Sequence, residues 1–183
     1  MKEVISLMKK SQNSLLILTL VFFLIFVGCS KKEVPTNDPG VASKAAVVIN
    51  DNVHIRENPS ADSKSLLKLE RGNLVKILSK KVVENEEWSY IEPVCFSYPP
   101  QIGWVLSKDY TTDKNKTTPN QGFIDSKNVY KKPASNQAFI REKLSSAVSI
   151  TRRENGWAYC TFPAGSEAGW VKESDISYEF PER

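Results

Sequence analysis

The sequence has little of what enzymes and metalloproteins need for their chemistry. Among its 183 residues there is a single histidine, His54, and there are three cysteines. Nucleophilic catalysis by serine or cysteine needs a positioned base beside the nucleophile. Structural zinc sites need cysteine and histidine clustered at short spacings. Neither pattern occurs, so we expect a protein that is not an enzyme and that holds no metal and no cofactor.

A strong charge of either sign is also missing. The chain has 25 basic and 21 acidic residues, and the first 28 residues carry three of the basic ones and one of the acidic ones. Subtracting them leaves 22 basic and 20 acidic residues, a net charge of +2. Nucleic-acid binding needs a clustered basic face, and a polybasic membrane patch needs clustered lysines. The scattered lysines therefore predict no nucleic-acid partner.

No apolar run reaches the length of a comfortable membrane span. The run from Leu15 to Val27 has 13 residues, is broken only by Thr19, and follows three lysines. A transmembrane helix needs about 20 apolar residues. A basic start, a short apolar core and a small residue before a cleavage point are typical of a secretory signal peptide, here residues 1–28. An uncleaved apolar helix is the alternative.

The end of this run carries a specific motif. Phe26-Val27-Gly28-Cys29 resembles the lipobox of bacterial lipoproteins, with Phe26 where that family usually has Leu. The resemblance implies that the Cys29 thiol receives a diacylglyceryl group, that the chain is cut before it, and that the new amino terminus is acylated. Two or more chains hold firmly, since each buried CH₂ contributes about 0.8 kcal/mol. The implied location is the cell envelope, at the outer membrane or the periplasmic face.

Polar stretches divide the rest of the chain. Residues 29–44 contain two prolines and a glycine and predict a flexible tether. Residues 113–121 predict an interdomain linker without an apolar face to dock. Residues 45–112 and 122–178 each hold short β-type runs separated by turn residues, which predicts an all-β fold. Residues 179–183 form a tail, and we expect the first segment to fold alone.

The motifs of these two segments resemble the bacterial SH3-like domain, SH3b. In the first segment the marks are Val53–Ser60, similar to that family's LNVRSGPS turn, Leu69–Val75, similar to its L-x-x-G-x-x-V hairpin, and Trp88–Ile91 and Gly103–Val105, similar to its W-x-x-V and GWV strands. The second segment keeps Pro133, Gly156-Trp157, Gly169-Trp170-Val171 and Asp175-Ile176, and is a degenerate copy. The resemblance implies two small SH3-like barrels in tandem.

Aromatic side chains are the candidates for a ligand site, because SH3-like barrels hold extended peptides in aromatic-lined grooves. The candidates are Arg56, Tyr90, Tyr98 and Trp104 in the first segment, and Tyr130, Tyr159 and Trp170 in the second. Tyr98 lies in a proline-containing loop with no evident role in the core. The alternative for the tryptophans is that they fill the barrels.

With Cys29 lipidated, Cys95 and Cys160 remain, one in each segment. An even number of cysteines in an exported protein is compatible with a disulfide between them. Free cysteine is also among the most buried residue types, so two separate buried thiols are the other alternative.

Together, the resemblances imply a lipid-anchored, non-enzymatic protein of the cell envelope whose modules bind peptidoglycan peptides or envelope proteins. One competing hypothesis is a structural spacer or assembly protein without a small ligand. Another is an accessory subunit of a cell-wall hydrolase.

The lipobox makes a direct prediction. Cys29→Ala should abolish incorporation of a radioactive fatty acid, because no other thiol lies beside the signal peptide. Labelling of cells that express the wild type and the variant measures this. Undiminished label in the variant would contradict the lipoprotein hypothesis.

Overall fold

The computed structural model describes residues 44–94, 99–113, 115–126, 128–135, 138–140, 144–163 and 168–181. The predicted signal peptide, Cys29 and the tether up to residue 43 lie outside the described residues, as do Cys95 and Tyr98. Within the described ranges the regular structure consists of β-strands and short 3-10 turns, so the predicted all-β class is confirmed. No helix in this part of the chain is long and apolar enough to cross a membrane.

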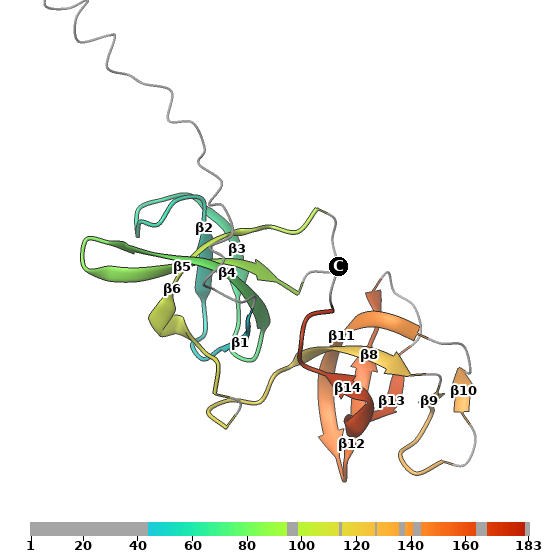
Figure 1. Cartoon of the computed structure of the whole chain (residues 1–183). Coiled ribbons are helices and arrows are strands. Elements are labelled where there is room, and N and C mark those ends of the chain that lie inside the picture. The colour runs from blue at the N-terminus through green and yellow to red at the C-terminus, as the bar shows by residue number, and fades with distance from the viewer. Residues whose placement is uncertain are drawn as a thin grey trace, which may run out of the picture. The chain divides into compact units, whose positions relative to one another are not determined.

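The strands form two sheets (Figure 1). The first contains β1 (Lys44–Val48), β2 (Val53–Arg56), β3 (Ser65–Leu69), β4 (Leu74–Val83), β5 (Glu86–Pro93), β6 (Gly103–Leu106) and β7 (Tyr110–Thr111), with the 3-10 turn η1 (Ser107–Asp109) before β7. The second contains β8 (Gln121–Ser126), β9 (Val129–Tyr130), β10 (Ala138–Ile140), β11 (Leu144–Glu154), β12 (Trp157–Thr161), β13 (Gly169–Lys172) and β14 (Ile176–Ser177), with η3 (Glu173–Asp175) before β14.

Both sheets have the same topology. The strand order is β3-β2-β6-β5-β4-β1-β7 in the first sheet and β10-β9-β13-β12-β11-β8-β14 in the second. The strands pair antiparallel, and replacing each strand of one sheet by its counterpart reproduces the order of the other. The repetition seen in the sequence motifs is therefore a repetition of the whole strand order.

The strand register shows which residues correspond. The pairing of β4 with β5 shifts between Ile77 and Ser79, and the pairing of β11 with β12 shifts between Ile150 and Arg152. Such a shift is the mark of a β-bulge. Because the bulge lies at the same place in both hairpins, residues 147–150 correspond to residues 74–77.

Each sheet packs its own hydrophobic core, which follows from the alternation of side chains along a strand. In β2, Val53 and Ile55 are buried while His54 and Arg56 are partly exposed. The first core contains Ala46, Val48, Val53, Ile55, Leu69, Val75, Ile77, Ile91, Val105 and Tyr110. The second contains Ile124, Val129, Val148, Ile150, Ala158, Cys160, Val171 and Ile176.

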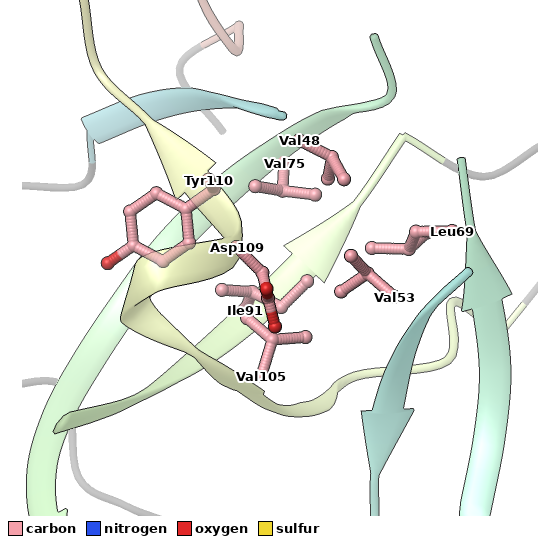
Figure 2. Close-up of a pocket in the computed structure, with 8 residues that line it drawn as sticks. All are labelled: Val48, Val53, Leu69, Val75, Ile91, Val105, Asp109 and Tyr110. Carbon is pink, nitrogen blue, oxygen red and sulfur yellow. The ribbon is translucent and has the colours of Figure 1, made fainter. Parts of the chain in front are cut away.

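Figure 2 shows the interior of the first sheet, where core side chains point toward one another beside Asp109 and Tyr110. The space that these side chains leave is too small for a water molecule. It is a packed core and not a ligand cavity.

Two tight turns give both hairpins their shape. Glu84 and Asn85 have φ angles of 51° and 66°, and Asn155 and Gly156 have φ angles of 49° and 78°. Two successive residues with positive φ are what a two-residue type I′ hairpin requires. These residues form the tips of the β4–β5 and β11–β12 hairpins.

A third apolar cluster joins the two sheets. Its buried members are Val47 of β1, Leu74 of β4 and Val94, which follows β5. The partly buried side chains that pack against them are Ala45, Phe123, Ala147 and Phe180. Phe123 and Phe180 are themselves in edge contact, with ring centroids 5.1 Å apart. An isolated first segment would expose part of this cluster, so we expect it to be less stable than the same segment in the whole chain.

The end of the predicted linker is docked on the first sheet. Asn120 donates its backbone N–H to the Gly72 carbonyl over 2.8 Å and its side-chain amide to the Arg71 carbonyl over 3.0 Å. The Gln121 side-chain carbonyl accepts a bond of 3.0 Å from the Leu74 backbone N–H. The expectation of an undocked linker is therefore wrong at its carboxyl end. Docking uses polar side chains, so an absent apolar face did not exclude it.

Gly72 is where this docking can be tested, with Gly156 as a matched control. Both have positive φ, so an alanine at either position carries a similar backbone cost of about 1 kcal/mol or more. A Cβ on Gly72 would lie 3.0 Å from the Asn120 side chain and 3.2 Å from the Thr118 carbonyl oxygen, while a Cβ on Gly156 meets no atom within 4 Å. Gly72→Ala should lower the free energy of unfolding further, by roughly 1–3 kcal/mol.

Chemical denaturation of the full-length variants measures both free energies of unfolding. Equal losses in Gly72→Ala and Gly156→Ala would contradict the close packing of Asn120 on this turn.

Candidate functional site

Three of the predicted ligand-binding residues lie side by side across the first sheet. The register pairs Arg56 of β2 with Trp104 of β6, and Trp104 with Tyr90 of β5. Their chain neighbours Ile55 and Val105 belong to the core. Side chains alternate along a strand, so Arg56, Trp104 and Tyr90 share the opposite face of the sheet. We call these three residues the first row.

The second sheet carries an equivalent row. The register pairs Tyr130 of β9 with Trp170 of β13, and Trp170 with Tyr159 of β12. These three residues, the second row, are the predicted candidates of the second segment. Tyr130 therefore takes the position of Arg56, and each lies three residues before a proline, Pro133 or Pro59.

Both rows contain a tyrosine in contact with a tryptophan. The ring centroids of Tyr90 and Trp104 are 5.1 Å apart in a tilted arrangement, and those of Tyr159 and Trp170 are 5.4 Å apart in an edge contact. The two tryptophans are each only 7% exposed, although neither belongs to a core cluster. The half-buried tyrosines are thus the more accessible part of each row.

A glycine in β6 allows this strand to pair closely with β2 at the first row. A Cβ on Gly103, the residue before Trp104, would lie 2.5 Å from the Arg56 carbonyl oxygen and 2.7 Å from Ile55. Atoms cannot approach so closely, which means that β6 reaches β2 only because this position has no side chain. The glycine of the GWV motif therefore has a structural reason here.

An arginine lies at opposite ends of the two rows. Arg56 is the β2 end of the first row, and Arg152 of β11 lies beyond Tyr159 of the second row. In the first row, an Arg56 guanidinium nitrogen donates to the Ser63 carbonyl over 2.7 Å. In the second sheet, Arg152 pairs with Tyr159 in the register, and its guanidinium lies 5.4 Å from the centre of the Trp170 ring. This is a cation–π contact. Arg152 is not recognisable as a site residue from the sequence, because only the bulge before it brings it beside the row.

A surface pocket of about 180 Å³ lies on the first sheet and includes one end of the first row. It is lined by Asp51, His54, Arg56, Trp88, Leu106 and Asp109, together with Asn50, Asn52, Val53 and Ala61. Trp88 of β5 and Leu106 of β6 are paired in the register, and Trp88 shares its face with Tyr90, two residues on. Of these residues the sequence analysis had named only Arg56 as a binding candidate.

Several polar side chains of the pocket have a partner within the protein and keep further hydrogen-bonding capacity. Asp109 accepts a bond of 2.9 Å from the Asn50 side-chain amide. Asp51 lies 3.7 Å from the Arg71 guanidinium, and the His54 Nδ1 atom is 2.8 Å from the Ser65 hydroxyl. A carboxylate offers about four acceptor positions and a guanidinium five donors. The pocket can therefore hold ligand groups of both charge signs.

The acidic hairpin tip between β4 and β5 holds paired side chains. Glu87 pairs with Lys80 over 2.7 Å, and Glu86 pairs with Lys108 over 3.0 Å. The hydrogen bond between Glu87 and Lys80 is the main cause of a lowered pKa for Glu87 and a raised pKa for Lys80. No group of metal-ligand residues occurs among the described residues.

Cys160 is a free thiol in the second core, with no exposed surface. Burial disfavours the thiolate and raises the pKa of Cys160 to about 12. Cys95, the other half of the disulfide considered from the sequence, lies outside the described residues. The buried-thiol alternative describes Cys160 in this structure.

No protein-family model matches the sequence, and no curated protein matches it. Among solved structures, the chain is similar to NlpC2 from Trichomonas vaginalis, with 15% identity and a TM-score of 0.27 over 75% of this chain and 49% of that protein. A candidate autolysin from Listeria monocytogenes gives 16% identity and a TM-score of 0.27 over 74% and 62%.

The chain thus spans less than two thirds of the length of either protein. Similarity at this TM-score assigns neither a family nor an activity to the chain.

The burial of Cys160 predicts that its thiol reacts slowly in the native protein. In a full-length Cys29→Ala/Cys95→Ser variant at pH 8, the remaining thiol should react with a disulfide reagent at least about a hundredfold more slowly in the native protein than in denaturant, because the thiolate is the reacting form. Absorbance of the released reagent measures both rates. Similar rates, or a wild-type mass short by two hydrogens, would contradict a buried free thiol.

Proposed function

We propose that this chain is a lipid-anchored, non-enzymatic protein of the cell envelope in which two SH3-like barrels of the SH3b type carry binding faces. The anchor at Cys29 rests on the lipobox resemblance. The barrels rest on the order of the SH3b motifs, and the repeated strand order supports them. A location at the outer membrane or the periplasmic face follows from the same resemblance.

One observation carries the binding part of the proposal. Arg56, Trp104 and Tyr90 are adjacent on the face of the first sheet opposite to its core, and a pocket opens beside Arg56. An aromatic face provides stacking area, and a guanidinium forms strong bonds with carboxylates. This combination suits an extended peptide with a free carboxylate.

Peptidoglycan peptides are the partners we favour. They are short and carry free charged groups, and they surround a protein tethered to an envelope membrane. Envelope proteins with extended segments are the other partners that the same face would suit. The first sheet should contribute most of the affinity, because the second has Tyr130 in place of Arg56.

Matched tyrosine variants test the proposal. Tyr90→Ala and Tyr159→Ala each remove a ring in contact with a tryptophan, so their effects on stability should be similar. In co-sedimentation with purified peptidoglycan, Tyr90→Ala should weaken binding several-fold, since a lost aromatic contact costs about 1 kcal/mol. Tyr159→Ala should bind nearly as well as the wild type.

Other results would favour the competing hypotheses. Unchanged binding by both variants would remove the rows from the site, and no binding by any of the three proteins would favour the spacer or assembly hypothesis. A zymogram separates the enzymatic alternatives: clearing of peptidoglycan by this chain alone would contradict the non-enzymatic proposal, while clearing only with a hydrolase would indicate an accessory subunit.

A further inference from the structure

The two sheets differ at the position that Arg56 and Tyr130 share. In the second sheet the Tyr130 ring lies edge-on to Trp157, with the centroids 5.1 Å apart and the planes at 85°. The first-sheet counterpart of Trp157 is Trp88, because each lies two residues before the tyrosine of its row. Beside Trp88 there is no tyrosine at this position, and the pocket is open there.

The Arg56 side chain, at the position of Tyr130, is bonded to a loop of the first sheet. Its guanidinium donates to the Ser63 carbonyl in the connection between β2 and β3 over 2.7 Å. Arg56 therefore borders the pocket at one side, while Trp88 and Leu106 line it as apolar surfaces. In the second sheet, by contrast, the Tyr130 side chain occupies the space beside the equivalent tryptophan, Trp157.

We propose that the surface pocket lined by Arg56, Trp88 and Leu106, the Trp88 pocket, binds a short zwitterionic peptide. In the second sheet, Tyr130 of the chain itself fills the equivalent space beside Trp157. The identity of the occupant as a peptide rests on the proposed function. The open space beside Trp88 and the filled space beside Trp157 do not depend on it. Tyr130, a predicted ligand-binding residue, becomes an internal occupant under this proposal.

The charges of the pocket specify the zwitterion. Asp51, from the connection between β1 and β2, and Asp109, from η1, provide carboxylates for a peptide amino group. Arg56, from β2, provides unused guanidinium donors for the peptide carboxylate. Charge-assisted bonds of this kind are the stronger hydrogen bonds in proteins. Leu106 and the small exposed part of Trp88, which is 3% exposed, form an apolar wall that suits small aliphatic side chains.

The second sheet lacks this combination. Lys172, an exposed residue, pairs with Trp157 where Leu106 pairs with Trp88. Tyr130 replaces the guanidinium of Arg56. The acidic residue of the 3-10 turn does have a counterpart, Asp175 in η3. We therefore expect zwitterionic peptides to distinguish the two sheets.

Trialanine with free termini is the probe, titrated into the full-length chain and followed by the indole N–H signals of Trp88 and Trp157 in NMR spectra. Trp88→Phe and Trp157→Phe assign the two signals. Trialanine should shift the Trp88 signal and leave the Trp157 signal in place. N-acetyl trialanine and trialanine amide should each bind at least about tenfold more weakly, since each lacks one charge-assisted bond.

Arg56→Tyr gives the first sheet the residue that fills the second, and should abolish the Trp88 shift. Tyr130→Ala is the matched control and should bind trialanine like the wild type. Arg56→Lys, which keeps the charge without the planar fork, covers the case in which Arg56→Tyr does not fold, and should bind several-fold more weakly.

Four results would overturn the pocket: no Trp88 shift at saturating trialanine, equal shifts at Trp157, equal binding of the blocked peptides, or wild-type binding by Arg56→Tyr and Arg56→Lys. If peptidoglycan binding persists while any of these occurs, the proposed function stands and this inference falls. If trialanine binds as described but peptidoglycan does not, the proposed function falls and the pocket stands.

Discussion

Antiparallel pairing of β2, β6 and β5 is the interaction on which the rest of the structure depends. It brings Arg56, Trp104 and Tyr90 together on one face of the first sheet. Because neighbouring residues of a strand point to opposite faces, the same pairs place Ile55 and Val105 in the core. The core therefore stabilises the register, and the register positions the candidate binding residues. A slip by one residue would exchange the two faces.

The same pairing occurs twice with different consequences. Both sheets keep a tryptophan and a tyrosine in the row, both keep a bulge in the long hairpin, and both bury a separate core. They differ at the position of Arg56 and Tyr130, where one sheet has a pocket and the other an aromatic contact. The repeated strand order therefore tolerates different residues at this outer position, because Arg56 and Tyr130 lie outside the two core clusters.

Local sequence patterns were sufficient to predict the all-β class and the repetition of motifs along the chain. They also identified all three residues of each row. They did not reveal the pocket, because Asp51, Trp88 and Asp109 come from distant parts of the chain and only the fold brings them together. Asn120 was missed for a related reason: a polar residue in a polar stretch gives no sign of which carbonyl groups it will bond.

The central claim is that the outer face of the first sheet, and not that of the second, is the binding face. Backbone amide shifts of the full-length chain, recorded with soluble peptidoglycan fragments, test it most directly. The account predicts that the perturbed amides lie in β2, β5, β6 and the connection between β1 and β2. Perturbations of equal size in β9, β12 and β13, or confined to the tip of the β4–β5 hairpin, would contradict it.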